Sequence, residues 1–576
     1  MTSDPANMKT KLLPPAVFLV VSLAFTLPLF LKWEFIGVGD WELFCTMAAV
    51  PVKTVIHFGQ FPFWNPYLGG GNILFAHPEV GICSPFFPLL LLFGPVAGLK
   101  VQILVAYFLG FYGTYLLSRK IGLGVFSSYL VAFVYYGSSY FALHFSIGHI
   151  PFTHFCFLPW LVLFLLMAEQ NWKYIFGCAV AVALIILGNG AAVPFLYTMF
   201  FSAMLVIMLS IEQSHLRHIR RFLVAVVMGV LLAAVKFVPM YYYLSRNRWE
   251  GMPTDQVPLS LALTGLFSFD QWLFRTVGPG QYWGWHEYGA YLSPLVLVLA
   301  IVGGIFAWRR SRPWLILAVF FFVFGLGHFS GVSLWNLMVH LPGFSSIRSP
   351  ARAFQFVVLG LAVVSGFGLD YCLNRLKERF GGGHYLAVLL VGAVIVVNLV
   401  INLPSLRTIG YKKPDRVTFQ NEFRQEIGRK DNIYNQFQRN RGSLVAPWLS
   451  GYQESRGLVT PTHEVLMEYV MQGEAQVISR RYTPNRVAYV IKPSSSGSLV
   501  FGIGYDEGWY AEDGRPLFEN NGLVSTRFSD QDRELILRYR TPYFYAGLLI
   551  SLLALVGCLL LRFNVHLGNR FEAIFK

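Results

Sequence analysis

Long apolar runs separated by short polar or basic stretches dominate the first 403 residues, and one more run follows residue 542. A helix needs about 20 apolar residues to cross the hydrocarbon core of a bilayer. The pattern therefore predicts a polytopic α-helical membrane protein with about 12 spans. Their ranges are 12–31, 99–117, 125–142, 152–168, 173–187, 193–211, 222–244, 289–308, 313–329, 352–373, 385–403 and 543–562.

Two apolar stretches near the N-terminus need separate interpretation. The stretch SPFFPLLLLFGP (84–95) is too short to span and is bounded by prolines, so we interpret it as a re-entrant or interfacial helix. The first run, 12–31, is followed by Lys32 and Trp33 without a small-residue cleavage pattern. It is predicted to be an uncleaved span rather than a removed signal peptide.

A polar segment of domain size, 404–542, separates the last two spans. Polar sequence over 416–430 favours a helix, and alternating strand-like runs follow as VAYVIKP, SLVFGIGY and ELILRYR. We predict a mixed α/β domain ending in a small β-sheet. The chain then has three parts, which are a multi-span domain (1–403) with a long first outer loop (32–98), the mixed domain (404–542), and a final span with its tail (543–576).

The net charge of +15 is gathered in short basic clusters between spans, such as HLRHIRR at 215–221 and WRRSR at 308–312. Such clusters mark the cytoplasmic ends of spans. With these clusters inside, both termini are cytoplasmic, and the first outer loop and the mixed domain face outward. The basicity is then a topology signal, which argues against a nucleic-acid partner.

The six cysteines have no metal-binding spacing. Cys45 and Cys83 share the first outer loop, where they could pair or remain isolated thiols.

Polar residues that lipid would not tolerate gather near the outer ends of the predicted spans. The candidates among them are Asp40, Glu42, Trp64, Asn65, His77, Glu79, His149, His286 and Glu287. Their convergence predicts a cavity at the outer leaflet. Each also has a plainer explanation as interfacial filler, and Gly69, Gly70 and Gly71 form a flexible turn rather than a phosphate loop.

Three cations lie near the same face. Lys236 sits about two helical turns inside its span, where it could snorkel outward or meet a lipid phosphate. Arg348 and Arg352 flank Pro350 at a predicted helix start. They could converge on one anion or anchor the span at the headgroups.

Several separated motifs occur in the order seen in YfhO-like bacterial membrane proteins. They are GDWELF, FPFWNPYLGGGNILFAHPEVGICSPFFPL, GHIPFTHFCFLPW, LAAVKFVPMYYYL, LPGFSSIRSPARAF and the tail GYDEGWYAEDGRPLFENNG. From about residue 35 to 562 the chain resembles this family, which is similar to the GT-C class of glycosyltransferases. It departs from the family's pattern at Lys236, where a neutral polar residue is expected, and at GNG (188–190), where a His-Pro pair is expected.

The resemblance implies an inverting glycosyltransferase of the bacterial plasma membrane. Its donor is a sugar on a polyprenyl phosphate, and its acceptor is an extracytoplasmic glycan, lipid or protein. Asp40 matches the general base, and His77 with Glu79 match ligands of a divalent cation, Mg or Mn. Lys236, Arg348 and Arg352 are expected to bind the donor phosphate.

Two other function classes stay open on the sequence. A transporter or flippase for a lipid-linked sugar would explain the spans and Lys236, although no internal repeat is visible. An envelope scaffold would explain the domain at 404–542 but not the polar first outer loop.

Overall fold

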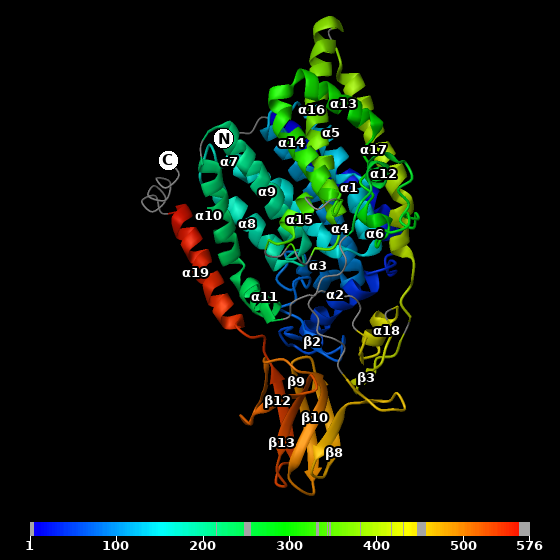
Figure 1. Cartoon of the computed structure of the whole chain (residues 1–576), viewed down its shortest axis with the longest axis vertical. Coiled ribbons are helices and arrows are strands. Elements are labelled where there is room, and N and C mark those ends of the chain that lie inside the picture. The colour runs from blue at the N-terminus through cyan, green and yellow to red at the C-terminus, as the bar shows by residue number, and fades with distance from the viewer. Residues whose placement is uncertain are drawn as a thin grey trace.

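The computed structural model describes residues 5–563, except 215, 247–254, 330–332, 342–343, 345–346, 381, 416, 430 and 446–456, with side chains from residue 12. A bundle of long helices carries a β-rich part at one end (Figure 1). The predicted tail beyond residue 563 lies outside the described residues.

All twelve predicted spans are helical. The helices are α1 (Pro5–Leu31), α4 (Pro95–Lys120), α5 (Val125–Tyr136), α6 (Ser139–Ile147), η1 (Ile150–Phe157), α7 (Leu158–Met167), α8 (Tyr174–Leu187), α9 (Val193–Glu212), α10 (Arg217–Leu232), α11 (Ala234–Arg246), α13 (Pro294–Phe306), α14 (Trp308–Gly325), η4 (Pro350–Ala353), α16 (Phe354–Phe380), α17 (His384–Arg407) and α19 (Phe544–Phe563).

Among the described residues, eight helical segments are long and apolar enough to span, or nine if α10 and α11, bent by 88°, form one span. Of the other predicted spans, α8 and α13 are only 14 and 13 residues long, and α14 begins with three arginines. The chain is a multi-pass membrane protein with fewer full-length spans than the hydropathy pattern predicts.

Charged side chains bind the free backbone groups at two helix ends. Lys100 of α4 is fully buried and donates to the carbonyls of Lys32 (2.5 Å) and Trp33 (3.1 Å), just past the end of α1. Asp370 of α16 accepts from Gly124 N (2.9 Å) and Ser127 Oγ (2.6 Å) where α5 begins. A cation near a helix C-terminus and an anion near a helix N-terminus both interact favourably with the helix dipole. These contacts therefore hold α4 against α1 and α16 against α5.

Short elements cover the end of the bundle that faces the β-rich part (Figure 1). They include α2 (Trp41–Ile56), the hairpin of β1 (Trp64–Asn65) and β2 (Asn72–Ile73), and α3 (Phe87–Phe93). Three further short helices are α12 (Leu259–Phe267), η2 (Trp285–Glu287) and α15 (Leu334–Met338). The short helix predicted within 84–95 is α3. The six cysteines, including Cys45 and Cys83, are free thiols.

Two antiparallel sheets of four strands form a β-sandwich. One sheet has the order β12 (Leu517–Asn520), β13 (Leu523–Phe528), β10 (Gly497–Gly504), β7 (Glu468–Gln472), and the other β11 (Trp509–Ala511), β14 (Glu534–Tyr539), β9 (Arg486–Pro493), β8 (Ala475–Thr483). Apolar side chains of β9, β10, β13 and β14 share one core. The three strand-like runs of the sequence are β9, β10 and β14.

The predicted helix at 416–430 is wrong. Its described residues contain β3 (Arg424–Glu426), which pairs in parallel with β4 (Arg441–Ser443), and the helix of this region is α18 (Ile433–Gln438). A short two-stranded sheet of β5 (Leu458–Val459) and β6 (Val465–Leu466) follows. A polar stretch without hydrophobic periodicity can be a helix or an irregular segment, and polarity alone does not tell them apart. In this region it is α18 that packs against α2.

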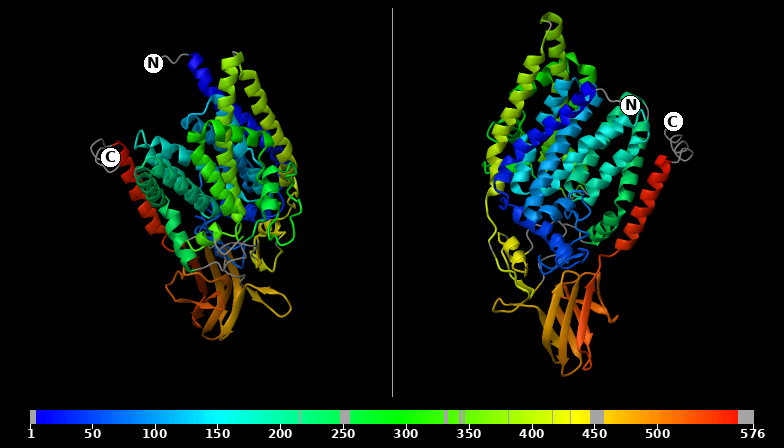
Figure 2. Two further views of the ribbon diagram at one scale, coloured as in Figure 1. Left: turned by 45° about the horizontal axis from the view of Figure 1, so that its top comes forward. Right: turned by 180° about the vertical axis from the view of Figure 1, so that it is seen from behind.

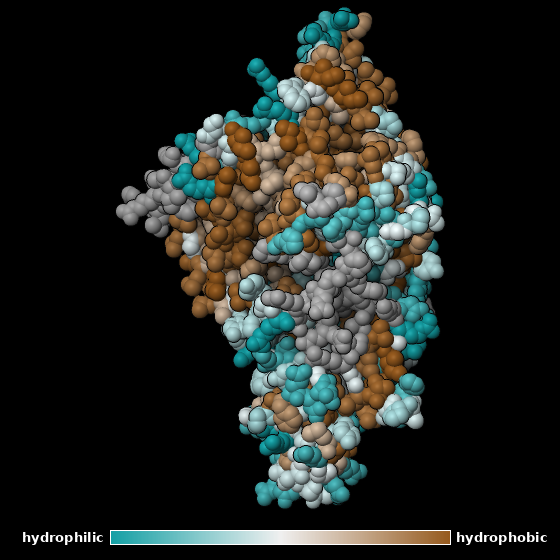
Figure 3. Space-filling model, viewed as in Figure 1, coloured by the Kyte–Doolittle hydropathy of each residue, from teal (hydrophilic) through white to brown (hydrophobic). Residues whose placement is uncertain are grey.

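The surface follows this division. Apolar side chains cover the visible faces of the helices, and hydrophilic ones gather on the sandwich (Figure 3). α1 begins and α19 ends at the end of the bundle remote from the sandwich, and α19 lies against α10 and α11 (Figure 2). The sandwich therefore lies at the opposite end of the bundle from the start of α1 and the end of α19.

Candidate active site

Asp40 lies at a tight corner between two segments of the bundle. It directly precedes α2, its backbone N–H donates to Ile147 O (2.8 Å), and the indole of Trp41 donates to Phe145 O (3.0 Å). The turn after α6 has Gly148 at φ +102°, and a Cβ there would lie 2.5 Å from Trp41 N. Glycine is therefore required for α6 to approach Asp40 so closely.

A chain of polar side chains starts from the Asp40 carboxylate. Asp40 Oδ2 lies 3.3 Å from His149 Nε2, and His149 Nδ1 lies 2.8 Å from Nδ1 of His144. The Asp40 side chain is 44% exposed, whereas that of His149 is 13% exposed. One imidazole must donate in the His144–His149 contact, so the two rings hold opposite tautomers or share an extra proton.

The charges around Asp40 favour its ionised form. Partial burial works to raise the pKa of Asp40, but the hydrogen bond and charge of His149 outweigh it. The charges of His286 and Arg352 act in the same direction, so the pKa lies below its ordinary value. Asp40 is thus a carboxylate at neutral pH that water or a ligand can reach.

A buried ion pair forms the opposite wall. Arg352 donates from Nε (2.8 Å) and Nη2 (2.5 Å) to the two carboxylate oxygens of Glu287, whose side chain is 1% exposed. Burial works to raise the pKa of Glu287, but the charge and hydrogen bonds of Arg352 hold it well below its ordinary value. Burial also lowers the pKa of the adjacent His286 to about 4, against the attraction of Glu287.

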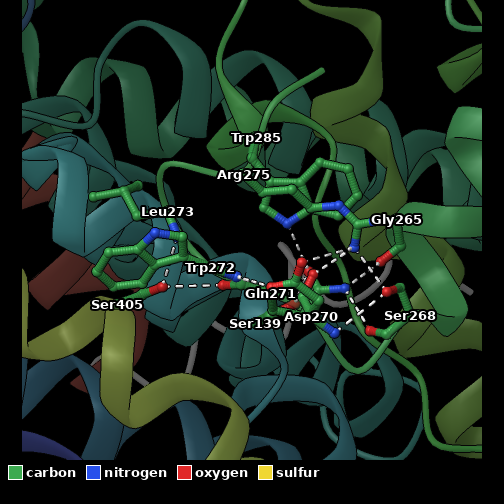
Figure 4. A network of polar contacts seen from close by, with 10 residues as sticks. All are labelled: Ser139, Gly265, Ser268, Asp270, Gln271, Trp272, Leu273, Arg275, Trp285 and Ser405. Carbon is green, nitrogen blue, oxygen red and sulfur yellow. Dashed lines mark hydrogen bonds and ion pairs between the residues drawn. The ribbon is translucent and has the colours of Figure 1, made fainter. Parts of the chain in front are cut away.

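A glutamine hub positions the segment that carries His286 and Glu287 (Figure 4). Gln271 accepts from Ser139 Oγ (3.1 Å) and from the indole N–H of Trp285 (3.2 Å), and its amide donates to Ser268 O (2.8 Å). Ser405 of α17 in turn donates to Gln271 O (3.0 Å). These contacts fasten the 255–291 segment to α6 and α17.

Arg275 completes the same network. Its Nη1 donates to Ser268 Oγ and to Asp270 O, both at 2.7 Å, and its guanidinium lies 4.3 Å from the Trp285 ring centroid. Because Trp285 directly precedes His286, this stacking also limits movement of the site residues.

Glu79 and Arg348 both lie within electrostatic reach of Asp40 and Arg352. Burial raises the pKa of Glu79, and repulsion by Asp40 raises it further. The nearby cations lower it by less than this rise. Burial lowers the pKa of Arg348 to about 10, and the like charge of Arg352 contributes. His77 is fully buried, and its Nδ1 accepts from Glu79 N (3.2 Å).

Lys236 occupies a different position from the other cations. It is 1% exposed, and its ammonium donates to the carbonyls of Val80 and Gly188, the latter at 3.0 Å. The partner expected for an intramembrane lysine is thus backbone of the first outer loop and the end of α8. The contact ties these two segments together beside Glu79.

Three predicted candidates lie in structural contacts instead. Glu42 accepts from Lys412 Nζ (2.7 Å) and from Tyr434 N (3.1 Å). Trp64 packs on Trp509 and Tyr539 of the sandwich, and the Oδ1 of buried Asn65 accepts from Tyr67 N (2.9 Å). Glu42 and Trp64 thus join the first outer loop to residues 404–542, whereas Asn65 shapes the loop itself.

The residues that could hold a cation differ from those predicted. Among the described residues, the group with suitable ligand atoms within 4.8 Å of one another is His149, His286 and Glu287, without His77 or Glu79. Two imidazoles and one carboxylate suit Mn²⁺ or Zn²⁺ better than Mg²⁺, which prefers oxygen ligands. In the structure, Glu287 is already engaged by Arg352.

A narrow pocket begins beside Glu79 and passes between α2, α3 and α4. Phe44 and Met47 of α2, and Phe87 and Leu90 of α3, form its apolar wall, and Gln102 and Asn189 supply polar groups. The exposed side of α3 carries Leu92 and Phe93. The pocket therefore joins the polar site to an apolar helix at the bundle surface.

Sequence reasoning missed three contributors to the site. His144 lies inside an apolar run, Gln271 lies in an outer segment without a motif, and Gly148 is one glycine among 53. The signal that was available is GHIPFTHF, in which a glycine directly precedes His149 after an apolar helix.

No family model and no curated protein matches the chain. Its structure is similar to the solved arabinofuranosyltransferase AftD from Mycobacteria, at 15% identity and a TM-score of 0.43, over 68% of this chain and 26% of that one. It is also similar to ArnT from Cupriavidus metallidurans bound to undecaprenyl phosphate. Identity is 13% and the TM-score 0.47, over 76% of this chain and 86% of that one.

A third similar structure is the oligosaccharyltransferase AglB from Archaeoglobus fulgidus with an inhibitory peptide and a dolichol-phosphate. Identity is 12% and the TM-score 0.42, over 76% of this chain and 64% of that one. The chain thus spans about a quarter of the length of AftD and less than two thirds of AglB. These likenesses concern overall shape, and no activity of this chain follows from them.

Proposed function

We propose that the protein is a membrane glycosyltransferase that moves a sugar from a polyprenyl-phosphate donor to an acceptor hydroxyl outside the membrane. The observation that carries the proposal is the Asp40 carboxylate, which is ionised, partly exposed, in contact with His149 and within electrostatic reach of Arg348 and Arg352. A base facing a cationic wall is the arrangement that an inverting transfer from a phosphate requires.

In this reaction Asp40 removes the proton of the acceptor hydroxyl as its oxygen bonds to the sugar's anomeric carbon. The bond from that carbon to the phosphate oxygen breaks, and the lipid phosphate leaves with the electron pair. Arg348, which lies 5.9 Å from the Trp283 ring centroid, and Arg352, which is paired with Glu287, supply positive charge near the leaving phosphate.

A divalent cation would fit beside this base as an alternative neutralising group. His149, His286 and Glu287 would hold it, with Glu287 exchanging its bond to Arg352. When bound, the cation supplies positive charge for the departing phosphate. Without it, Glu287 stays paired with Arg352, and the positive charge near the phosphate comes from Arg348 and this pair.

The proposal is tested by envelope glycan analysis with Asp40→Asn. We expect deletion of the gene to remove a sugar that wild type restores and Asp40→Asn, at equal membrane abundance, does not. Loss of a general base lowers the rate by about 10²- to 10⁴-fold. Asp431→Asn, an exposed outer carboxylate, serves as the control and should restore the sugar.

Restoration by Asp40→Asn would overturn the role of the carboxylate. If the labelled donor lipid then crossed vesicle membranes in a protein-dependent way, the protein would be a transporter. If function instead required only residues 404–542, it would be a scaffold.

A further inference from the structure

A second pocket lies where the sandwich meets the membrane helices, and we call it the junction pocket. It is bounded by the C-terminal turns of α11, the β10–β11 turn, β12, the end of β14 and the first outer loop at Ile73 and Ala76. Its volume is about 200 Å³. A single water needs only about 10–15 Å³ on this measure, so the junction pocket has room for a small organic group.

Its walls combine aromatic rings with carboxylates. Tyr242 and Tyr243 come from α11, and Tyr505 and Tyr539 come from the sandwich. Tyr242 and Tyr505 are half-buried, so parts of their rings are exposed to the pocket. A tyrosine offers an apolar face together with a polar hydroxyl, which suits ligands that are apolar on one side and hydroxylated at the edge.

The carboxylates differ in what they already bind. Asp506 Oδ1 accepts from Gly508 N (2.8 Å) and from the Tyr539 hydroxyl (2.9 Å). Glu507 accepts from Tyr242 and Arg246, which couples α11 to the sandwich. Glu519 of β12 makes no ion pair or side-chain hydrogen bond in the described part of the chain, so its oxygens remain to accept from a ligand.

A buried hydroxyl supplies an independent sign of a missing partner. Thr541 lines the junction pocket and is 3% exposed, and among the described residues its Oγ1 interacts only weakly, with the Tyr539 side chain, and makes no hydrogen bond within 3.5 Å. Buried hydroxyls are normally hydrogen-bonded. The acceptors Glu519 and Asp506 and this hydroxyl together match a ligand with several hydroxyl groups.

We propose that the junction pocket binds a saccharide unit of the acceptor. The unit packs on the ring of Tyr505 and donates its hydroxyls to Glu519 and Asp506, whereas the ring of Tyr242 already contacts Arg246 (4.7 Å) and Tyr543 (4.6 Å). This inference rests on the proposed function, because it assigns the acceptor to the class of glycans. The segment 73–81 lines this pocket at one end and the pocket beside Glu79 at the other, so one stretch of the first outer loop connects the two.

Binding is measured directly on the full-length protein in nanodiscs. The probe is the fluorescently labelled oligosaccharide pool released by mild acid from the source organism's cell envelope. Wild type and Asp40→Asn should retain the same oligosaccharides. Glu519→Gln and Tyr505→Leu should each weaken their binding by about tenfold, as expected when a charge-assisted hydrogen bond or a packing face is lost.

Glu534→Gln, on β14 outside the junction pocket, is the matched control and should bind like wild type. The proposal is overturned if wild type retains no oligosaccharide, or if Glu519→Gln, Tyr505→Leu and Glu534→Gln bind equally. It is also overturned if Glu519→Gln instead releases a bound phospholipid, seen by native mass spectrometry, because the ligand would then be a headgroup.

Failure of the proposed function and failure of the saccharide site give different results in these experiments. If Asp40→Asn keeps full transfer activity, the role of Asp40 is wrong, while saccharide binding that depends on Glu519 still stands. If Asp40→Asn loses transfer and the pocket variants bind normally, only the acceptor assignment falls.

Discussion

The bidentate pair of Arg352 and Glu287 is a buried charge pair whose partners come from different segments of the chain. Their side chains are 14% and 1% exposed, so neither charge is well solvated without the other. Removing one partner of such a pair costs about 3–5 kcal/mol, because the remaining charge stays buried. The pair also holds the Arg352 guanidinium in place, since both of its bonds go to the Glu287 carboxylate.

We expect Arg352→Met and Glu287→Gln each to lower the free energy of unfolding by about 3–5 kcal/mol. The double variant should lose less than the sum, since no uncompensated charge remains. Chemical unfolding in detergent measures all three. Arg375→Ala, in the exposed pair with Glu378 on the same helix, should change nothing measurable, and additive losses in the double variant would contradict the coupling.

The corner between α6 and η1 is the element that brings His149 to Asp40. A Cβ on Gly148 would lie 2.5 Å from Trp41 N and 2.7 Å from the carbonyl carbon of Asp40. The corner would have to shift, and a misplacement of about 1 Å in a catalytic group lowers rates by about 10²-fold. Gly148→Ala should therefore lower sugar transfer by about that factor, measured with membranes of equal protein content.

Gly122→Ala separates this clash from backbone strain. Gly122 has φ +93° and no atom within 4 Å of a built Cβ, so its substitution adds strain of roughly 1 kcal/mol and nothing else. If both variants lose transfer to the same extent, the close approach at Gly148 does not set the geometry of the site.

At the scale of the whole molecule, the sequence predicts those elements whose hydrophobic period and length identify them. The helical segments, α3, the strands β9, β10 and β14 and the helix start near Pro350 follow from local pattern. The pairing of sheets and the partners of Glu42, Trp64 and Lys236 do not, because they join residues far apart in the chain. A buried lysine looks the same in sequence whether it meets a phosphate or a backbone carbonyl.

The candidate site divides in the same way. The acidic and histidine residues near span ends were identifiable because lipid excludes them. That Asp40, His149, His286 and Glu287 meet, whereas Glu42 and Asn65 turn to structural contacts, depends on the Gln271 network and the Gly148 corner. Neither leaves a periodic signal.

The sandwich is joined to the bundle through the first outer loop, and Trp64 is the centre of that joint. Its ring centroid lies 4.5 Å from that of Tyr539 and 5.3 Å from that of Trp509, and the backbone N–H of Trp64 donates to Asn485 Oδ1 (3.1 Å). Since the same loop continues to His77 and Glu79, the sandwich supports one wall of the site. Loss of this ring should therefore affect both stability and transfer.

We expect Trp64→Ala to lower the free energy of unfolding by about 3–5 kcal/mol, the range for removing a buried aromatic side chain. Transfer should fall as well, because the loop that carries Glu79 loses its outer support. Trp308→Ala, which removes a ring that is 49% exposed at the start of α14, is the matched control and should change stability by less than about 1 kcal/mol. Thermal unfolding and transfer by the same preparations decide the matter. If Trp64→Ala destabilises the protein while the transfer rate per folded molecule is unchanged, the sandwich is held by the loop but does not support the site.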